Sequence, residues 1–285
     1  MRDRPKVSVL IITYNHESFI ADALESALAQ ETDFEYEIVV GDDHSTDRTW
    51  EIVTRYADRH PDVLRAVRND VNIGPHPNFT RSRGRTRGEY LALLDGDDYW
   101  TSPHKLQRQV DQLDRRADQT LVFHPVEVLD GRRRTWYPPG RRSEYDLGDL
   151  MKGNFIATGS VVCRNRPEVE YPRWYDQSRV MPGDWAFFCL NARHGDIGYI
   201  DTPMSVYRRH DSGVWAGSPP HDRVRRLRAS IELCRRLNED FDHEYDASVR
   251  RAVAEMRLKI FVLRTVPFLV RPLMWLRDLA GRMRS

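Results

Sequence analysis

The N-terminal third of the chain alternates between short apolar runs and segments whose apolar residues recur at helical spacing. A continuous, β-branched run occupies Val7–Thr13, and further strands are predicted at 36–40, 64–67 and 90–94. Helical spacing occupies 19–30 and 49–60. Strands that are buried on both faces form such continuous runs, and helices that join parallel strands make right-handed crossovers. The pattern therefore predicts an α/β fold with a mixed, mainly parallel sheet flanked by helices.

The remaining sequence is less regular, and we expect it to complete one large domain and to add a helical extension. Further strands are predicted at 120–129, 160–164 and 198–200, and charged amphipathic helices at 223–238 and 247–263. A chain of 285 residues can hold one large α/β domain with an appendage. We place the domain at 1–218, divided near residue 105, and a basic C-terminal extension at 219–285.

The composition argues against a protein that binds nucleic acid, is stabilised by disulfide bonds or spans a membrane. The formal net charge is only +1, so the whole molecule is not steered toward nucleic acid. Cys163, Cys189 and Cys234 are scattered, which is typical of free thiols in a reducing compartment. The first apolar run is too short for a signal peptide, and none reaches the roughly 18–20 apolar residues of a spanning helix. We expect a cytoplasmic location, with the inner face of the membrane as an alternative.

An acidic cluster, Asp95-Gly96-Asp97-Asp98, follows directly after the apolar run at 90–94. Its carboxylates would repel one another unless a divalent cation such as Mg2+ or Mn2+ lay among them, because hard cations prefer clustered oxygen ligands. A strand that ends here places the cluster at the carboxyl edge of the sheet, where open α/β folds bind ligands. The cluster therefore predicts a metal that holds a phosphorylated substrate.

Other interpretations of the acidic cluster fit less well. An EF-hand loop would need Gly and Glu where the chain has Trp100 and Leu106. A haloacid-dehalogenase-type phosphatase would carry Thr or Val in place of Tyr99 and would place its acids after the first strand of the chain. A plain acidic turn remains open, but it would leave the repulsion between the carboxylates uncompensated.

Polar residues also follow the first two predicted strands, as Thr13-Tyr14-Asn15 and as the segment 42–47. Neighbouring parallel strands end at the same edge of a sheet, so these residues should lie side by side. A carboxylate there can accept the N–H of a nucleobase, and Tyr14 can lie against the face of the base. From the residues alone, turn and N-cap hydrogen bonds of Asp43 and Asp47 explain the pattern equally well.

Several ordered motifs together resemble the family-2 glycosyltransferases. They are Val-Ser-Val-Leu-Ile-Ile-Thr-Tyr-Asn at 7–15, Glu-Ile-Val-Val-Gly-Asp-Asp-His-Ser-Thr-Asp at 37–47, Asn72-Ile73-Gly74, and the segment 88–98. The likeness is close over 6–105 and continues in pieces to about residue 216. The family consists of inverting enzymes with the GT-A fold, a Rossmann-like fold of nucleotide-diphospho-sugar transferases. The resemblance implies this fold, a UDP-sugar donor, and Mg2+ or Mn2+. One departure is His44, where the family more often has glycine.

The resemblance also assigns the nucleotide and the metal to particular residues. The half at 1–105 would bind the nucleotide, and the half at 106–218 the acceptor. Asp95 and Asp97 would form the D-x-D motif, which contacts the ribose and holds the metal, and His210 would be a further metal ligand. The expected nucleotide-binding residues are Thr13, Tyr14, Asn15, Asp43, Asn72, Gly74, Asp95 and Arg208.

An inverting transfer also needs a base that removes the proton of the acceptor hydroxyl. The resemblance places this base at Asp184, for which a helix N-cap is the structural alternative. The expected acceptor contacts are Asn154, Thr158, Trp185 and Trp215. The implied activity is metal-dependent transfer of a sugar to a carbohydrate, lipid-linked or small-molecule acceptor. It would serve the synthesis of cell-envelope polysaccharide, glycolipid or glycosylated natural products.

Two other functions remain as alternatives. A sugar-phosphate nucleotidyltransferase would carry a Gly-rich, basic N-terminal loop, which the segment 13–16 lacks. A non-catalytic scaffold of the same fold would bind sugar nucleotides or glycans, although the retention of Asp95, Asp97 and Asp184 argues against lost chemistry.

The basic segment 257–285, which contains an aromatic residue, predicts peripheral membrane contact. Packing of this segment on the domain or on a second copy of the chain is the alternative.

Overall fold

The computed structural model describes residues 4–130, 133–138, 140–166, 171–177, 182–210 and 220–265. They form two compact units. The larger unit holds the described residues up to 210 except 151–153 and 182, and the smaller consists mainly of α8 (Pro220–Asp240) and α9 (Asp246–Thr265). The boundary predicted at 218 falls among residues 211–219, outside the described residues, and the division near 105 stays a prediction.

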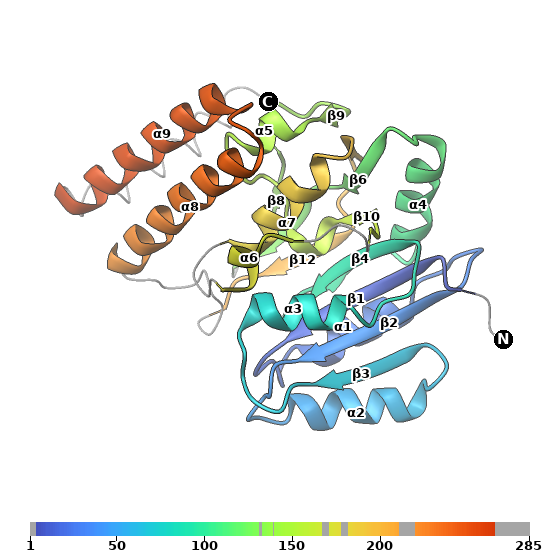
Figure 1. The fold of residues 1–285 in the computed structure, drawn as a ribbon. Coiled ribbons are helices and arrows are strands. Elements are labelled where there is room, and N and C mark those ends of the chain that lie inside the picture. Colours follow the sequence, from blue (N-terminus) through green and yellow to red (C-terminus); the bar gives the residue numbers. More distant parts are fainter. Residues whose placement is uncertain are drawn as a thin grey trace. The chain divides into compact units, whose positions relative to one another are not determined.

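An eight-stranded sheet forms the centre of the larger unit (Figure 1). Its strand order is β3-β2-β1-β4-β10-β6-β11-β9. The strands are β1 (Val7–Thr13), β2 (Tyr36–Asp42), β3 (Leu64–Arg68), β4 (Tyr90–Asp95), β6 (Gln119–Phe123), β9 (Glu144–Tyr145), β10 (Val162–Arg164) and β11 (Asp196–Tyr199). β10 is antiparallel to β4 and β6, and β9 is antiparallel to β11. All other neighbours are parallel, so the prediction of a mixed, mainly parallel sheet is confirmed.

A second sheet of four short strands lies in the same unit, in the order β5-β12-β7-β8. These strands are β5 (Tyr99–Trp100), β7 (Val126–Leu129), β8 (Arg133–Trp136) and β12 (Ser205–Arg208). The predicted strand region at 120–129 is therefore divided between the two sheets, as β6 and β7. β12 pairs with β5, which directly follows the acidic cluster, and this pairing brings residues after 205 back to the cluster.

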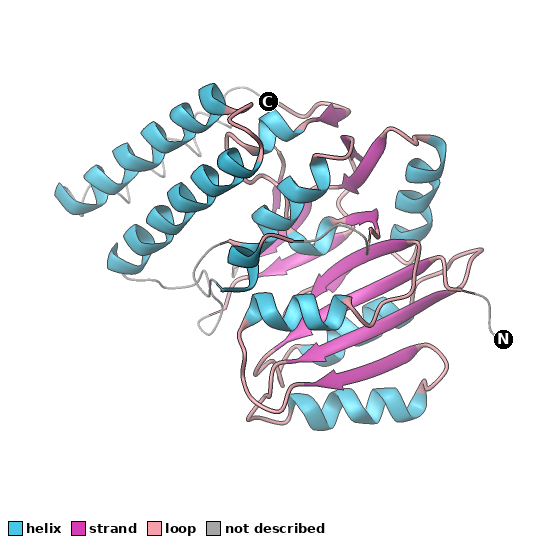
Figure 2. Cartoon of the chain, in the orientation of Figure 1, coloured by secondary structure: helices cyan, strands magenta, loops and turns pink. Residues whose placement is uncertain are grey.

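Helices cover both faces of the large sheet (Figure 2). They are α1 (Ile20–Leu28), α2 (Thr49–Arg59), α3 (Pro75–Arg83), α4 (Lys105–Arg115), α5 (Leu147–Leu150), η1 (Thr158–Ser160), α6 (Arg173–Gln177) and α7 (Gly183–Ala192). Apolar residues of α1, α2 and α4 share one core with alternate residues of β1, β2 and β4. α3 packs on the opposite face, where a Cβ at Gly41 would lie 2.1 Å from Ser82 Oγ, so the close approach requires glycine.

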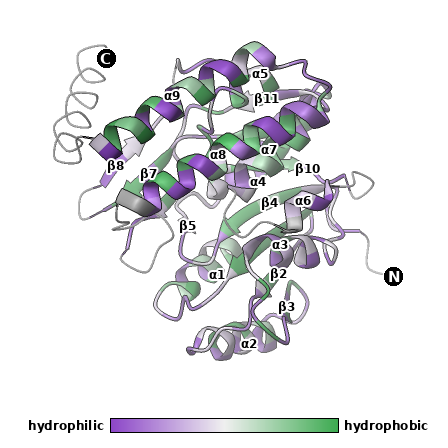
Figure 3. Ribbon diagram, turned by 60° about the vertical axis from the view of Figure 1, so that its left-hand side comes forward, coloured by the Kyte–Doolittle hydropathy of each residue, from purple (hydrophilic) through white to green (hydrophobic). Residues whose placement is uncertain are grey.

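The smaller unit is a pair of long helices that pack on one another. Both helices predicted at 223–238 and 247–263 are confirmed, each a few residues longer than expected. Polar and apolar residues alternate along both of them (Figure 3). No helix among the described residues is long and apolar enough to cross a bilayer.

Candidate active site

The carboxyl ends of β2, β1 and β4 lie side by side in the large sheet. In the parallel register, Thr13 of β1 is opposite Asp42 of β2, and Ile12 of β1 is opposite Asp95 of β4. The acidic cluster and the polar loops after β1 and β2 therefore share one edge of the sheet, where ligands bind in open α/β folds.

Side chains tie the loop after β1 to the loop after β2. The Asn15 N–H donates to Ser45 Oγ at 3.0 Å, and the Thr46 N–H donates to Asn15 Oδ1 at 2.8 Å. The Glu17 N–H donates to Asp47 Oδ2 at 3.0 Å. Asp47, a predicted N-cap, lies one residue before the N-cap position of α2. Its Oδ1 nevertheless accepts the N–H of Thr49, the first residue of the helix. The Asn15 side chain thus has a structural role in holding the two loops together.

His44 stands in this turn with a φ of +61°, in the left-handed region that glycine adopts without strain. Its Nδ1 lies 3.1 Å from the Asn69 carbonyl oxygen, a contact that helps to hold the conformation. The buried Asp42 accepts the Ser45 N–H at 3.0 Å within the same turn. The departure from glycine at His44 therefore leaves the turn intact.

Asp43 anchors the loop that leads into α3. Its Oδ1 accepts the Ile73 N–H at 2.9 Å, its Oδ2 accepts the Gly74 N–H at 2.8 Å, and its carbonyl oxygen accepts the Asn72 side chain at 3.3 Å. Asp43, Asn72 and Gly74 are thus brought together, and their contact with a nucleobase stays a prediction. Tyr14 is 41% exposed at the same edge, so its ring is available to a ligand.

Asp97 lies between two imidazoles. Its Oδ2 is 3.1 Å from His210 Nε2 and 3.8 Å from His16 Nε2, and His16 Nδ1 is 3.3 Å from Thr13 Oγ1. A Cβ at Gly96 would lie 2.7 Å from Thr13 Oγ1, so glycine is needed between the two acids. The sequence predicts His210 at this place but gives no signal for His16.

The other carboxylates of the cluster lie within electrostatic reach of one another. Burial, with the nearby charges of Asp97 and Asp184, raises the pKa of Asp95 to about 7, while a hydrogen bond with Thr158 opposes the shift. Burial and the charges of Asp97 and Asp95 also raise the pKa of Asp98 well above its usual value. The crowding of these groups creates a demand for a positive partner.

Arg208 returns to the cluster at the end of β12. Its backbone N–H donates to Asp98 Oδ1 at 2.8 Å, and its Nη1 donates to the Asp97 carbonyl oxygen at 3.1 Å. The guanidinium also pairs with Asp22 and lies 4.4 Å from the centre of the Tyr99 ring. Asp98 thus fixes the end of β12, and Arg208 is held rigidly beside the acidic cluster.

Asp184 lies in the first turn of α7. Asn154 Nδ2 donates to its Oδ2 at 3.1 Å. Burial raises the pKa of Asp184, and first-turn backbone N–H groups, the charge of His76 and the Asn154 hydrogen bond oppose the shift. The charge of Asp184 also contributes to the raised pKa of Asp95, so Asp184 lies within electrostatic reach of the acidic cluster. No pattern in the sequence indicates His76.

Of the two tryptophans predicted to contact an acceptor, the structure describes Trp185. Trp185 is only 5% exposed, and its Nε1 donates to the Leu150 carbonyl oxygen at 2.9 Å. This position in the core argues against an acceptor contact, because the ring of Trp185, the third residue of α7, is taken up by packing. Trp215 lies outside the described residues.

Within the described part of the chain, no group of three His, Cys, Asp or Glu side chains is arranged to hold a metal ion by itself. The available donors are carboxylates of Asp95 and Asp97 and imidazoles of His16 and His210. Oxygen and imidazole donors suit Mn2+, and Mg2+ commonly takes only one or two carboxylates together with substrate phosphates and water. The donor set therefore fits a cation whose remaining ligands come from a bound diphosphate.

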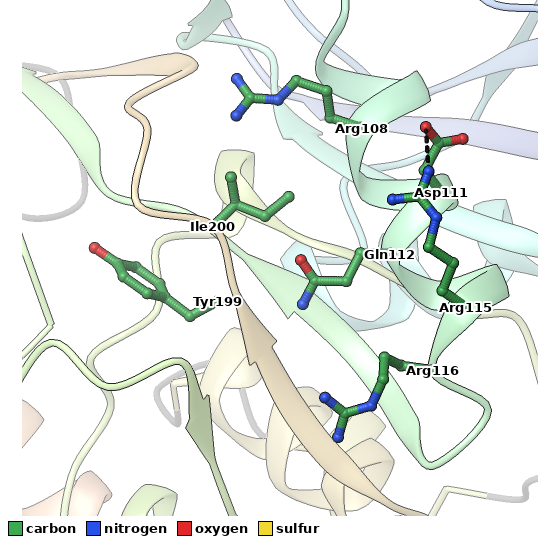
Figure 4. Close-up of a pocket in the computed structure, with 7 residues that line it drawn as sticks. All are labelled: Arg108, Asp111, Gln112, Arg115, Arg116, Tyr199 and Ile200. Carbon is green, nitrogen blue, oxygen red and sulfur yellow. Dashed lines mark ion pairs between the residues drawn. The ribbon is translucent and has the colours of Figure 1, made fainter.

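Elsewhere on the large unit, α4 and β11 border an open groove of about 540 Å3 (Figure 4). Three of its lining residues are arginines, and two of these are paired with acids. Arg115 lies 3.6 Å from Asp111, and Arg116 lies 2.7 Å from Asp118 and also pairs with Glu144. The lining carries three arginines and one acid, and it contains none of the residues of the acidic cluster.

Comparison with solved structures defines the class of the fold as GT-A. The chain superimposes on TarS of S. aureus in complex with UDP-GlcNAc with a TM-score of 0.68 and 20% identity, covering 93% of this chain and 74% of TarS. It superimposes on the mannosyltransferase PcManGT of Pyrobaculum calidifontis, in complex with GDP-Man and Mn2+, with a TM-score of 0.56 and 17% identity, covering 98% and 81%.

The sequence places the chain in a particular family of this class. Residues 8–212 match the model of glycosyl transferase family 2, and the chain belongs to that family. The uncharacterized protein Rv1520 of Mycobacterium tuberculosis is 42% identical over 214 residues, which cover 73% of this chain and 60% of Rv1520. The chain therefore spans less than two thirds of the length of this relative.

Proposed function

We propose that the protein is a metal-dependent, inverting glycosyltransferase that moves a sugar from a UDP-sugar to an acceptor hydroxyl. The observation that carries the proposal is that Asp184 lies near enough to the acidic cluster for its charge to act on Asp95, the neighbour of Asp97. Asp184 comes from a distant part of the sequence, and burial together with the charges of Asp97 and Asp184 raises the pKa of Asp95. Such crowding has a destabilising cost that a functional role would explain.

The nucleotide would lie at the ends of β1 and β2. Tyr14 offers an exposed ring to the base, and Asp43 lies beside the loop of Asn72 and Gly74. Thr13, Asn15 and Arg208 surround the same edge and would contact the ribose or the diphosphate. The nucleotide sugars in the TarS and PcManGT complexes support a donor of this class.

The diphosphate would lie over Asp95 and Asp97, where Mg2+ or Mn2+ would be held by these carboxylates and His210. The cation supplies charge stabilisation for the departing nucleotide diphosphate. The Mn2+ in the PcManGT complex supports this choice of cofactor. Arg208, which is fixed by Asp22 and the Asp97 carbonyl oxygen, adds a positive charge near the leaving group.

Asp184 would accept the proton of the acceptor hydroxyl as that oxygen attacks the anomeric carbon from the face opposite the nucleotide. The pKa of Asp184 is raised by burial, and a carboxylate with a raised pKa is a stronger base once ionised. Asn154 holds one oxygen of Asp184, and the acceptor hydroxyl would approach the other. The contact with Asp184 supports Asn154 as an acceptor-side residue, and Thr158, which bonds Asp95, would lie between donor and acceptor.

A matched set of variants separates binding from chemistry. We expect UDP with Mn2+ to raise the melting temperature of the wild type, because a ligand of the native state stabilises by mass action. Asp184→Asn should keep this shift and lose transfer of sugar from the donor. Asp97→Asn should lose the metal-dependent part of the shift, and Asp196→Asn, an exposed position at the start of β11, should change neither property.

The outcomes also discriminate between the alternatives. Wild-type transfer by Asp184→Asn would refute the assignment of the base, and a UDP affinity unchanged by EDTA would refute the metal site. Nucleotide binding without turnover on any donor would favour the non-catalytic scaffold. Release of pyrophosphate from a nucleoside triphosphate and a sugar phosphate would favour the nucleotidyltransferase.

The end of α9 supports peripheral contact with an anionic membrane. Leu258 and Phe261 are 64% and 62% exposed, and basic residues Arg257, Lys259 and Arg264 lie between and beside them. We expect co-sedimentation with phosphatidylglycerol vesicles that Phe261→Ser reduces. A change in oligomeric state with Phe261→Ser, and no vesicle binding, would instead favour contact between two copies of the chain.

A further inference from the structure

His76 lies against the helix that carries the proposed base. It is the second residue of α3 and is only 8% exposed. A Cβ built on Gly183, the first residue of α7, would lie 2.3 Å from both Cδ2 and Nε2 of the imidazole. The ring therefore rests directly on the backbone of the residue before Asp184, and glycine is required there for the approach.

A face of the His76 ring is packed as well. The imidazole stacks on the buried Tyr175 of α6, with ring centres 5.5 Å apart and planes inclined by 27°. His76 thus contacts both α6 and the start of α7. A ring packed on two elements couples them, because neither can move away from it without losing that contact.

The start of α3 is itself fixed from the nucleotide side of the site. The Ile73 and Gly74 N–H groups donate to the Asp43 carboxylate at 2.9 and 2.8 Å. His76 follows two residues later. The segment 73–76 therefore connects Asp43 at the end of β2 with the first turn of α7.

We propose that His76 is a positioning residue for Asp184, holding the first turn of α7 so that the carboxylate faces Asp95 and the acceptor hydroxyl. The proposal rests on the proposed role of Asp184 as the base. His76 acts through the backbone at Gly183 and has no part in the proton transfer itself. The charge of His76 also lowers the pKa of Asp184, which favours the ionised form that a base needs.

Other groups around the carboxylate do not replace this contact. Asn154 holds the side-chain oxygen of Asp184 but does not touch Gly183 in any described interaction. Asp95 faces Asp184 and repels it. Without the imidazole, the first turn of α7 would have room to shift away from Asp95, and misplacement of a catalytic group by about 1 Å can reduce the rate by about 100-fold.

The test compares His76→Ala with His76→Phe in the full-length chain. We expect His76→Ala to lower kcat at least about tenfold with the donor KM and the UDP-dependent thermal shift unchanged, since Asp43 contacts the backbone of the loop and not the imidazole. Phenylalanine keeps a planar ring of similar width, so His76→Phe should recover most of kcat. Wild-type kcat in His76→Ala, or equal loss in both variants, would overturn the proposal.

Gly183→Ala supplies an independent test of the same contact. The added methyl would overlap the ring, so this variant should also lower kcat. When Gly183→Ala is combined with His76→Ala, the imidazole is absent, so kcat should fall little below that of His76→Ala alone. If the two losses of kcat multiply instead, the contact between His76 and Gly183 is refuted. Asp184→Asn separates the two hypotheses. If it transfers sugar normally the proposed function fails, whereas an inactive Asp184→Asn beside a fully active His76→Ala refutes only the role of His76.

Discussion

Replacing Lys105 with methionine should make the stability of the protein less dependent on pH. Lys105 is the first residue of α4 and is completely buried. Its Nζ has no hydrogen-bond partner among the described residues and lies 4.2 Å from the centre of the Trp100 ring. Burial lowers the pKa of Lys105 well below its usual value.

The magnitude follows from proton linkage. A lysine in the unfolded chain titrates near pH 10.4, so between the lowered native pKa and about 10.4 the unfolded state binds more protons than the native state. Stability therefore rises with pH in this window, by up to about 1.4 kcal/mol for each pH unit from this one group. Lys105→Met removes the contribution, and it also removes an unpaired polar group whose burial costs about 1–3 kcal/mol.

Urea unfolding followed by tryptophan fluorescence, at about pH 8 and about pH 9 with a reductant present, measures the effect. We expect Lys105→Met to be more stable than the wild type at the lower pH, with an advantage that shrinks by about 1 kcal/mol at the higher pH. The exposed Lys259→Met is the matched control and should keep the pH dependence of the wild type. Equal pH slopes in the wild type and Lys105→Met would show that the buried amine is charged in the native state and would refute the reasoning.

Further substitutions test single contacts. His44→Val should cost about 1–2 kcal/mol in urea unfolding, because a β-branched residue is strained at a φ of +61°, and unchanged stability would contradict that conformation. Glu37→Gln should cost about 2 kcal/mol, since the buried carboxylate accepts a charged hydrogen bond from Arg87 Nη2 at 2.8 Å. Wild-type stability of this variant in buffer without added salt would argue against the pair. Trp185→Phe should cost about 1 kcal/mol by losing the bond to the Leu150 carbonyl oxygen while leaving the acceptor KM unchanged, and a large rise in that KM would restore Trp185 as an acceptor contact.

The strands of the large sheet were predictable wherever burial on both faces produced a continuous apolar run, as in β1 and β4. α4 was not predicted, although Leu106, Val110 and Leu113 recur at helical spacing and are buried. Its buried face also carries polar residues whose burial the sequence does not reveal. Lys105 and Gln109 are both fully buried, and Gln109 Nε2 donates to the Val122 and Ser160 carbonyl oxygens.

The acidic residues of the site were also predictable, because clustered carboxylates at a strand end are conspicuous in the sequence. His16 and His76 were not, since their roles depend on contacts with Asp97 and Gly183 that the fold alone creates. A tryptophan beside a proposed base could equally face a ligand or the core. Only the packing of α7 against the Leu150 carbonyl oxygen decides this for Trp185.

The bonds between the loops after β1 and β2 bear on the kinetics of donor capture. The N–H groups of Asn15, His16 and Glu17 are all bonded to side chains of the facing loop, at 3.0, 2.8 and 3.0 Å. These amides should therefore exchange slowly with deuterium even in the absence of nucleotide. A pocket wall that is already ordered loses little conformational entropy when a nucleotide arrives, so association there should proceed in a single step without a preceding loop closure.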